Sequence, residues 1–380
     1  MNSQNSQRIL VRGVNWLGDA VMTTPALLRL REARPKAHIT LLTHAKLQEL
    51  WRDHPAVDAI EPFAENESAW SIGRRLREKK FDVGLVLPNS HRSALELWVA
   101  KIPERIGYRR PWRNFFLTRA VPQRAGAVTM HKRSTPEIEE LIRQNAPQSK
   151  LPSGAHHIHQ YLHLTAALGA KPEPLPPQLV VSEKAVAEFI AKFKLGPSAS
   201  ESPVWLGLNA GAEYGPAKRW PEERFVEAAI EIQRRAHCRW LIFGLKSDSA
   251  MVARMTDQIS RGTGGQKESV AKIPRAINLA GATTLAEFCA GLKLCRVVLT
   301  NDSGPMHVAA ALGKPVVVPF GSTSPELTGP GLPGDTHHRL LSGHVPCSPC
   351  FLRECPIDFR CMHGISVDAV VKAISEVFHK

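Results

Sequence analysis

The sequence of 380 residues lacks the features that would assign it to several large classes of protein. No run of about 18 apolar residues is present, which is the length that a membrane-spanning helix requires. No internal repeat with a period of roughly 20–50 residues is visible, which argues against a solenoid. The opening residues, MNSQNSQ, are polar and unlike a secretory signal, so a cytoplasmic location is expected.

Two common ligand motifs are also absent. Gly13 and Gly18 do not have the GxGxxG spacing, and no acidic residue follows at the next expected strand end to hold a ribose. A dinucleotide site in the first half therefore has weak support. No RNA- or DNA-binding motif is recognisable, although the chain is strongly basic.

Positive charge is abundant, with a formal net charge of +14 and an isoelectric point of about 9.7. Such an excess favours an anionic partner: a nucleic acid, an anionic membrane surface or a phosphorylated substrate. The first half carries two basic clusters: Arg74, Arg75, Arg77, Lys79 and Lys80, and then Arg105, Arg109, Arg110, Arg113 and Arg119. The first cluster fits a solvated helix face equally well, whereas the second is interleaved with aromatic residues.

Strand and helix patterns alternate along the chain, and 43% of its residues are hydrophobic, enough for a large core. Strands are expected at 8–12, 38–43, 57–62, 81–87, 204–208, 239–243, 276–279, 296–300 and 315–320, with helices between them, including 19–34 and 67–80. Segments 171–178 and 195–203 are rich in Pro, Ser and Gly and predict a domain boundary. The sequence thus predicts two doubly wound α/β domains whose ligand sites face a shared cleft.

The most informative segment is 301–317, NDSGPMHVAAALGKPVV. Asp302, Ser303 and Gly304 lie where an expected strand ends and a helix begins, which is where open α/β sheets bind ligands and phosphates. Helix capping by Asp302 or Ser303 explains this position equally well. His307, one turn into the helix, is either structural or close to a bound phosphate or sugar.

Two further loops of the second half repeat this geometry. In the first loop, Asn209 and Gly211 precede Lys218, a cation that could meet a pyrophosphate, although an ordinary surface charge is the alternative. In the second loop, Gly244 would allow close approach of a nucleotide and Asp248 would accept a hydrogen bond from a ribose, with a capped turn as the alternative.

Asp19 begins the first expected helix, where capping is the simplest role. A carboxylate at the mouth of a cleft is also suited to act as a general base that takes a proton from an acceptor hydroxyl.

Four of the seven cysteines, Cys347, Cys350, Cys355 and Cys361, lie within fifteen residues. Thiolates this close could bind zinc, but the usual two CxxC pairs separated by a dozen or more residues are absent. Reduced cysteines packed in a loop, or an adventitious disulfide, are the expected state, and a structural metal is the alternative.

With these residues assembled, the chain resembles the bacterial ADP-heptose:lipopolysaccharide heptosyltransferases, most closely the heptosyltransferase II group. The resemblance spans nearly the whole chain and rests on VNWLGDAVMTTPAL at 14–27, LPNSHRSAL at 87–95, GAEYGPAKRWP at 211–221 and NDSGPMHVAAALGKP at 301–315.

The resemblance implies a GT-B fold, which consists of two Rossmann-like domains facing a central cleft. We expect an acceptor-binding domain at 1–185, a donor-binding domain at 200–365, and a C-terminal helix at 366–380 that packs back on the first domain. The implied reaction is inverting transfer of heptose from ADP-heptose to the first heptose of heptosyl-Kdo-lipid A. Transfer of the first or third core heptose, or of another nucleotide sugar, is the alternative, and nucleic-acid binding without chemistry is a rival of a different class.

The resemblance also implies residue roles. Asp19 corresponds to the base, Lys218 to the cation at the donor phosphates and Asp302 to the contact with the donor heptose, with Ser303, Gly304 and His307 completing that loop. Asp248 corresponds only loosely to the ribose-binding acidic residue. No cofactor is required in this family. As a group, Asn89 and the basic residues Arg74, Arg75, Arg77, Arg109 and Arg113 are candidates for the acceptor phosphates and Kdo carboxylates. We further expect a monomer that associates peripherally with the inner membrane of a Gram-negative bacterium.

Overall fold

The computed structural model describes residues 6–147, 151–196, 203–262 and 274–378. The chain forms two compact units: unit 1 comprises residues 1–128 and 154–180, and unit 2 comprises residues 129–153 and 181–380. Each unit contains a sheet of six parallel strands. Among the described residues, no helix is long and apolar enough to cross a membrane.

Unit 1 is a doubly wound sheet with the order β3-β2-β1-β4-β5-β6. Its strands are β1 (Arg8–Arg12), β2 (His38–His44), β3 (Ala59–Phe63), β4 (Val83–Val86), β5 (Glu104–Tyr108) and β6 (Arg119–Val121). Its helices are α1 (Leu17–Met22), α2 (Thr24–Ala33), α3 (Ala69–Arg77), α4 (His91–Val99) and α6 (Ile158–Ala166), with short 3-10 turns η1 (Ala45–Trp51) and η2 (Asn114–Phe116). Ile72 and Leu97, from α3 and α4, pack with Leu10 and Val86 of the sheet in one apolar core.

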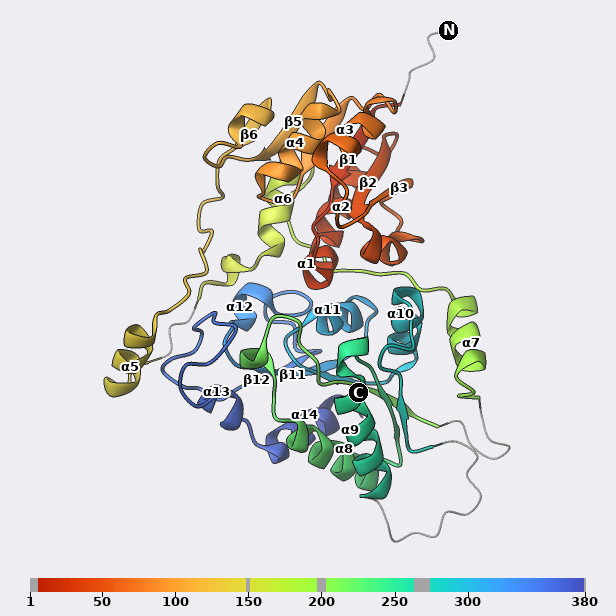
Figure 1. The fold of residues 1–380 in the computed structure, drawn as a ribbon, viewed down its shortest axis with the longest axis vertical. Coiled ribbons are helices and arrows are strands. Elements are labelled where there is room, and N and C mark those ends of the chain that lie inside the picture. Colours follow the sequence, from red (N-terminus) through yellow and green to blue (C-terminus); the bar gives the residue numbers. More distant parts are fainter. Residues whose placement is uncertain (1–5, 148–150, 197–202, 263–273, 379–380) are drawn as a thin grey trace. The chain divides into compact units, whose positions relative to one another are not determined.

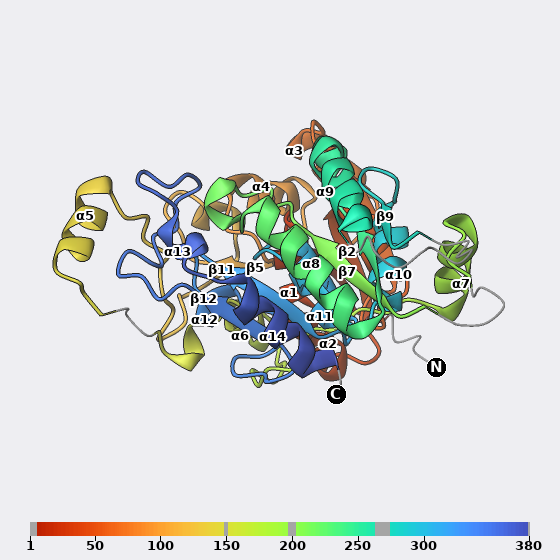
Figure 2. The ribbon, with the colours of Figure 1, turned by 90° about the horizontal axis from the view of Figure 1, so that it is seen from below.

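Unit 2 repeats this plan with the order β12-β11-β10-β7-β8-β9. Its strands are β7 (Trp205–Asn209), β8 (Arg239–Ile242), β9 (Ala276–Asn278), β10 (Val298–Thr300), β11 (Val316–Phe320) and β12 (Arg339–Ser342). Its helices are α5 (Thr135–Arg143), α7 (Glu183–Lys192), α8 (Glu222–Ala236), α9 (Ser249–Arg261), α10 (Leu285–Leu294), α11 (Gly304–Ala311), α12 (Pro325–Thr328), α13 (Arg360–His363) and α14 (Val367–Phe378), with 3-10 turns η4 (Pro216–Lys218) and η5 (Lys246–Asp248). Helices α8, α9 and α14 lie over one face of the sheet (Figures 1 and 2), and their apolar residues share one core with β7, β8 and β10.

Each sheet has one point where the chain reverses the direction in which it adds strands. In unit 1 this point lies between β1 and β4, where Val11 is paired with Leu85. In unit 2 it lies between β7 and β10, where Asn209 is paired with Thr300. The loops that leave these strands diverge to opposite faces, which opens a crevice at the carboxyl ends of the strands where ligands bind.

The observed domain boundaries correct the expected ones in two places. Residues 129–153, expected in the first domain, belong to unit 2, because Ile138 of α5 packs against Cys347 and Cys350 and the Arg133 backbone N–H donates to the Cys350 carbonyl at 3.1 Å. The last helix, α14, was expected to pack on the first domain. Its apolar face instead lies in the core of unit 2, where Val370 and Ile374 are buried.

Candidate active site

A cavity of about 300 Å³ lies at the carboxyl ends of β1 and β4 in unit 1. It is lined by Val14, Asn15, Trp16, Asp19, Leu87, Pro88, Asn89, Ser90, Tyr108, Gln160 and Tyr161. Asp19 is half-buried and is the one charged side chain among these lining residues. Two predicted residues, Asp19 and Asn89, therefore share one cavity with polar groups that can hold a hydroxylated ligand.

Asp19 occupies the first turn of α1, which begins at Leu17 with Trp16 as its N-cap. The N-cap position expected for Asp19 is therefore taken by another residue. Burial raises the pKa of Tyr161 well above its ordinary value, and the negative charge of Asp19 raises this pKa further. The Tyr161 hydroxyl therefore keeps its proton.

Two buried arginines hold the walls of this cavity. The Arg12 guanidinium is 2.8 Å from the Glu96 carboxylate and donates to Asn15 Oδ1 at 2.8 Å, which ties the loop after β1 to α4. The Arg113 guanidinium donates to the Pro88 carbonyl at 2.7 Å and to the Tyr108 carbonyl at 3.0 Å. Because Arg113 has no exposed surface, it reaches the cavity through the residues that it holds.

The predicted acceptor-binding arginines are not gathered at this cavity. Arg74, Arg77 and Arg109 are exposed and do not line it. Arg75 is 2.9 Å from Glu61 and 3.3 Å from Glu67, so its charge is compensated locally. Of this group, Arg113 is the member with a direct structural link to the cavity.

In unit 2, a buried ion pair bridges the two loops of the strand-order reversal. Lys218, on the loop after β7, places its Nζ 2.6 Å from Oδ2 of Asp302, on the loop after β10. The Lys218 side chain is 13% exposed and that of Asp302 is 3% exposed. Lys218 also lies over the Tyr214 ring, 4.9 Å from its centroid, so the cation is held in place by a carboxylate and an aromatic face.

The start of α11 lies directly beside this pair. Ser303 is the N-cap of α11, but its hydroxyl makes no cap hydrogen bond and donates instead to the Asn301 carbonyl at 3.2 Å. Capping by a Ser303 or Asp302 side chain therefore does not account for this loop. The amide groups at Gly304 and in the turn that follows form the partial positive end of a helix, which favours an anion. His307, one turn further, is buried.

Asp248 holds a tight turn after β8. Its carboxylate accepts a hydrogen bond from the Leu245 backbone N–H at 2.9 Å, which is the capped turn that the sequence offered as an alternative. The backbone of Gly211 passes so close that a Cβ there would lie 2.8 Å from Asp248 Oδ2, and a Cβ at Gly244 would lie 3.1 Å from the Asp248 Cβ. A side chain at either glycine would therefore crowd Asp248.

The structure adds a hydroxyl-rich loop that sequence analysis missed. Residues 321–324, GSTS, follow β11, and the Thr323 hydroxyl donates to Asp302 Oδ2. Ser322 is buried, and its hydroxyl has no hydrogen-bond partner among the described residues. The pattern that drew attention to 301–304, a buried strand followed by small polar residues, also marks this loop and would have found it.

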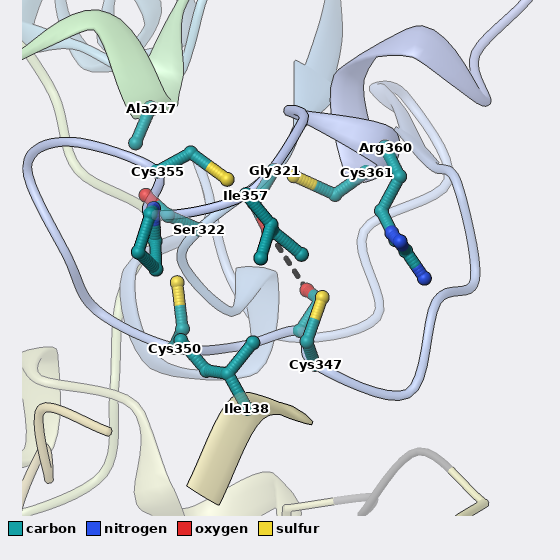
Figure 3. Close-up of a pocket in the computed structure, with 12 residues that line it drawn as sticks. Ile138, Ala217, Gly321, Ser322, Cys347, Cys350, Cys355, Ile357, Arg360 and Cys361 are labelled. Carbon is teal, nitrogen blue, oxygen red and sulfur yellow. Dashed lines mark hydrogen bonds between the residues drawn. The ribbon is translucent and has the colours of Figure 1, made fainter. Parts of the chain in front are cut away.

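The four clustered cysteines line a small cavity of about 10 Å³ in unit 2, and their sulfur atoms point toward the space beside Ile357 (Figure 3). All seven cysteines are free thiols, so the disulfide alternative does not hold. Burial raises the pKa of Cys361 to about 12, which keeps it neutral. Among the described residues, no group of three or more histidine, cysteine or acidic side chains is arranged to hold a metal ion.

The cysteine-bearing loop supports the walls of the Lys218 site. The Tyr214 hydroxyl donates to the Phe351 carbonyl at 2.7 Å, and the Phe351 N–H donates to the Ser322 carbonyl at 2.7 Å. The Ala217 N–H donates to the Arg353 carbonyl at 3.0 Å. The segments on both sides of the ion pair are therefore fastened to the same loop.

The model of glycosyltransferase family 9 (heptosyltransferase) matches residues 69–359.

The chain belongs to this family.

It is 32% identical to lipopolysaccharide heptosyltransferase 2 of Salmonella typhimurium over 343 residues, which cover 89% of each chain. It is 31% identical to the enzyme of the same name from Escherichia coli over the same shares. The solved structure of E. coli ADP-heptose lps heptosyltransferase II superposes with a TM-score of 0.74 at 26% identity, covering 98% of this chain and 99% of that one. The two predicted Rossmann-like domains of a GT-B fold are thereby confirmed, and the chain is a glycosyltransferase that transfers heptose in the synthesis of the lipopolysaccharide inner core.

Proposed function

We propose that the enzyme transfers heptose from ADP-heptose to a hydroxyl of the first heptose of heptosyl-Kdo-lipid A, with inversion at the anomeric carbon. The observation that carries this proposal is the Lys218–Asp302 pair at the strand-order reversal of unit 2. Its cation and the start of α11 suit the diphosphate of a nucleotide sugar, and the Asp302 carboxylate and nearby hydroxyls suit the sugar itself.

The proposed chemistry divides between the two units. Asp19 takes the proton from the attacking hydroxyl as that oxygen bonds to the anomeric carbon. The bond between this carbon and the departing ADP breaks in the same step, and the bonding electrons leave with ADP. A sugar hydroxyl is too weak an acid to ionise beforehand, so proton removal must accompany attack. Lys218 and the first amides of α11 stabilise the negative charge on the leaving diphosphate, so no cofactor is used in this scheme.

The other predicted residues of unit 1 are assigned to binding of the acceptor. Asn89 and Tyr161 offer hydrogen bonds to the acceptor sugar in the unit 1 cavity, and Arg113 keeps that wall in place. The phosphates and carboxylates of the acceptor extend beyond the cavity, toward the exposed cations Arg74, Arg77 and Arg109. The enzyme acts as a monomer in the cytoplasm, at the inner-membrane surface that displays its lipid-anchored acceptor.

Mass spectrometry of acceptors incubated with ADP-heptose tests this function. Kdo-lipid A carrying no heptose is compared with the same acceptor carrying one heptose. We expect a mass gain of one heptose on the second acceptor alone. Product from the first acceptor, or none from either, contradicts the proposed acceptor.

A further inference from the structure

Unit 1 carries a cluster of aromatic side chains outside the proposed active site. We call it the aromatic patch: Trp70 of α3, Trp98 of α4, and Phe115 and Phe116 of η2. The Trp98 ring lies 6.3 Å from Trp70, 6.2 Å from Phe115 and 5.9 Å from Phe116, measured between ring centroids. The four rings therefore form one continuous group built from three separate elements.

Three of the four rings are exposed to solvent, and Phe116 packs against the core of unit 1. Trp70 is 52% exposed, Trp98 36% and Phe115 76%, and Trp112, three residues before Phe115, is 87% exposed. Contiguous exposed apolar surface of this kind marks an interaction site, whereas single exposed apolar residues are ordinary.

The segment that displays Trp112 and Phe115 is fixed to the sheet. Arg113, between them, is fully buried and bonds the carbonyls of Pro88 and Tyr108. Its backbone N–H donates to the Pro111 carbonyl at 2.7 Å. Trp112 itself has a positive φ of 61°, a conformation that costs energy for a bulky residue. The hydrogen bonds of Arg113 therefore fix the turn on which Trp112 is exposed.

Four exposed cations lie on the elements that carry the patch or on the loops next to them in the chain. Arg74 and Arg77 follow Trp70 by four and seven residues on α3, so they share its face of the helix, and both are exposed. Arg109 and Lys101 are exposed on the neighbouring loops. None of these four cations forms a salt bridge with a described residue, in contrast to Arg75 on the same helix, which pairs with Glu61.

We propose that the aromatic patch and Trp112 dock the enzyme on an anionic bilayer, with the rings at the level of the lipid headgroups. This inference rests on the proposed function, because a lipid-anchored acceptor is presented at such a surface. Tryptophan side chains favour the membrane–water interface. Unpaired arginines and lysines add attraction to anionic lipids, so the charge and the apolar rings match one partner.

Vesicle cosedimentation tests the proposal, with vesicles of phosphatidylglycerol and phosphatidylethanolamine compared with phosphatidylcholine alone. The parent enzyme is compared with the triple variant Trp70→Ala, Trp112→Ala, Phe115→Ala. The matched control is Leu245→Ala with Met130→Ala, two exposed apolar residues of unit 2. We expect the parent and the control to bind the anionic vesicles, and the triple variant to bind at least about tenfold more weakly.

Turnover on a deacylated acceptor separates docking from catalysis. The triple variant should match the parent on the deacylated acceptor and lose rate only when the acceptor is embedded in anionic vesicles.

Equal vesicle binding by parent and triple variant would overturn the proposal, as would equal binding of the parent to phosphatidylcholine. If sedimentation without vesicles shows self-association that the triple variant loses, the patch is an interface between copies instead. Loss of turnover on the deacylated acceptor would make the patch part of the acceptor site. Failure of the parent to use any heptose acceptor would count against the proposed function and not against docking.

Discussion

The strand-order reversals of the two units have the same topology but differ in the charged side chains that lie beside them. At the reversal in unit 1, the described lining residues include one carboxylate, Asp19, and no cation. At the reversal in unit 2, Lys218 and Asp302 lie 2.6 Å apart and nearly buried. A carboxylate in a cavity lined by hydroxyl and amide groups suits the removal of a proton from a neutral sugar. A held cation at a helix start suits the departure of a diphosphate.

Replacement of Asp19 should produce the largest effect. Asp19→Asn keeps the shape of the side chain but cannot accept the proton, so we expect kcat to fall by about 10²–10⁴-fold. Steady-state release of ADP measures this loss. Asp53→Asn, an exposed aspartate of the same unit, is the control and should retain the parent kcat. Turnover of Asp19→Asn within a few-fold of the parent would remove the distinction between the two units.

Breaking the ion pair should affect both stability and donor use. Lys218→Met leaves the Asp302 carboxylate buried without its cation, which should cost about 3–5 kcal/mol of unfolding free energy. The loss of the cation should also lower kcat/KM for ADP-heptose by about 10²-fold or more. Urea denaturation and donor-dependent kinetics measure the two effects.

A second variant separates these two effects. Adding Asp302→Asn to Lys218→Met removes the uncompensated charge, so stability should largely return while donor use stays low. Lys192→Met, which breaks an exposed pair with Glu287, is the control and should change neither quantity by much. Recovery of donor use in the double variant would argue against a role for Lys218 at the diphosphate.

Replacement of Arg113 should have a smaller effect on kinetics, and this effect should be confined to binding of the acceptor. Arg113→Met deprives the carbonyls of Pro88 and Tyr108 of their donor, at a cost of about 1–3 kcal/mol in stability. We expect KM for the acceptor to rise by about tenfold while KM for ADP-heptose stays unchanged. Arg52→Met replaces an exposed arginine of the same unit and should leave both KM values as they are. A rise in the donor KM would show that the wall held by Arg113 serves both substrates.

The smallest effect is expected at the support of the Lys218 loop. Tyr214→Phe removes the hydrogen bond to the Phe351 carbonyl but leaves the ring under Lys218. The free energy of unfolding should therefore fall by about 1 kcal/mol. If the full amount were lost from donor binding, KM for the donor would rise by about fivefold, so we expect a rise no larger than this. Tyr214→Leu removes the ring as well and should have a larger effect. Equal kinetics of these two variants would show that the ring does not hold the cation.

Most strands of both sheets could be predicted because buried parallel strands are continuous apolar runs, as at Val83–Val86 and Val316–Phe320. The strands Glu104–Tyr108, Arg119–Val121 and Arg339–Ser342 were not expected, because each is short and begins with a charged residue. The expected single helix at 19–34 is wrong, since Thr23 separates α1 from α2. Pro25 lies in the first turn of α2, where its missing N–H costs nothing, although inside one long helix it would break the hydrogen-bonding pattern.

The candidate site was only partly predictable from the sequence. The sequence indicates the carboxyl edge of each sheet as the position of Asp19, Lys218 and Asp302, because each of them follows an expected strand. The contact between Thr323 and Asp302 and the support from Phe351 depend on long-range packing that no local pattern encodes. The placement of residues 129–153 in unit 2 has the same cause, because Ile138 packs against cysteines about two hundred residues later.

The central claim is that unit 2 holds the donor and unit 1 supplies the base. Isothermal titration calorimetry of ADP-heptose with Asp19→Asn and with Lys218→Met tests it most directly. We predict that Asp19→Asn binds the donor with the Kd of the parent, although its turnover is lost, and that Lys218→Met binds it at least about tenfold more weakly. Donor affinity that falls in Asp19→Asn and persists in Lys218→Met would contradict this division.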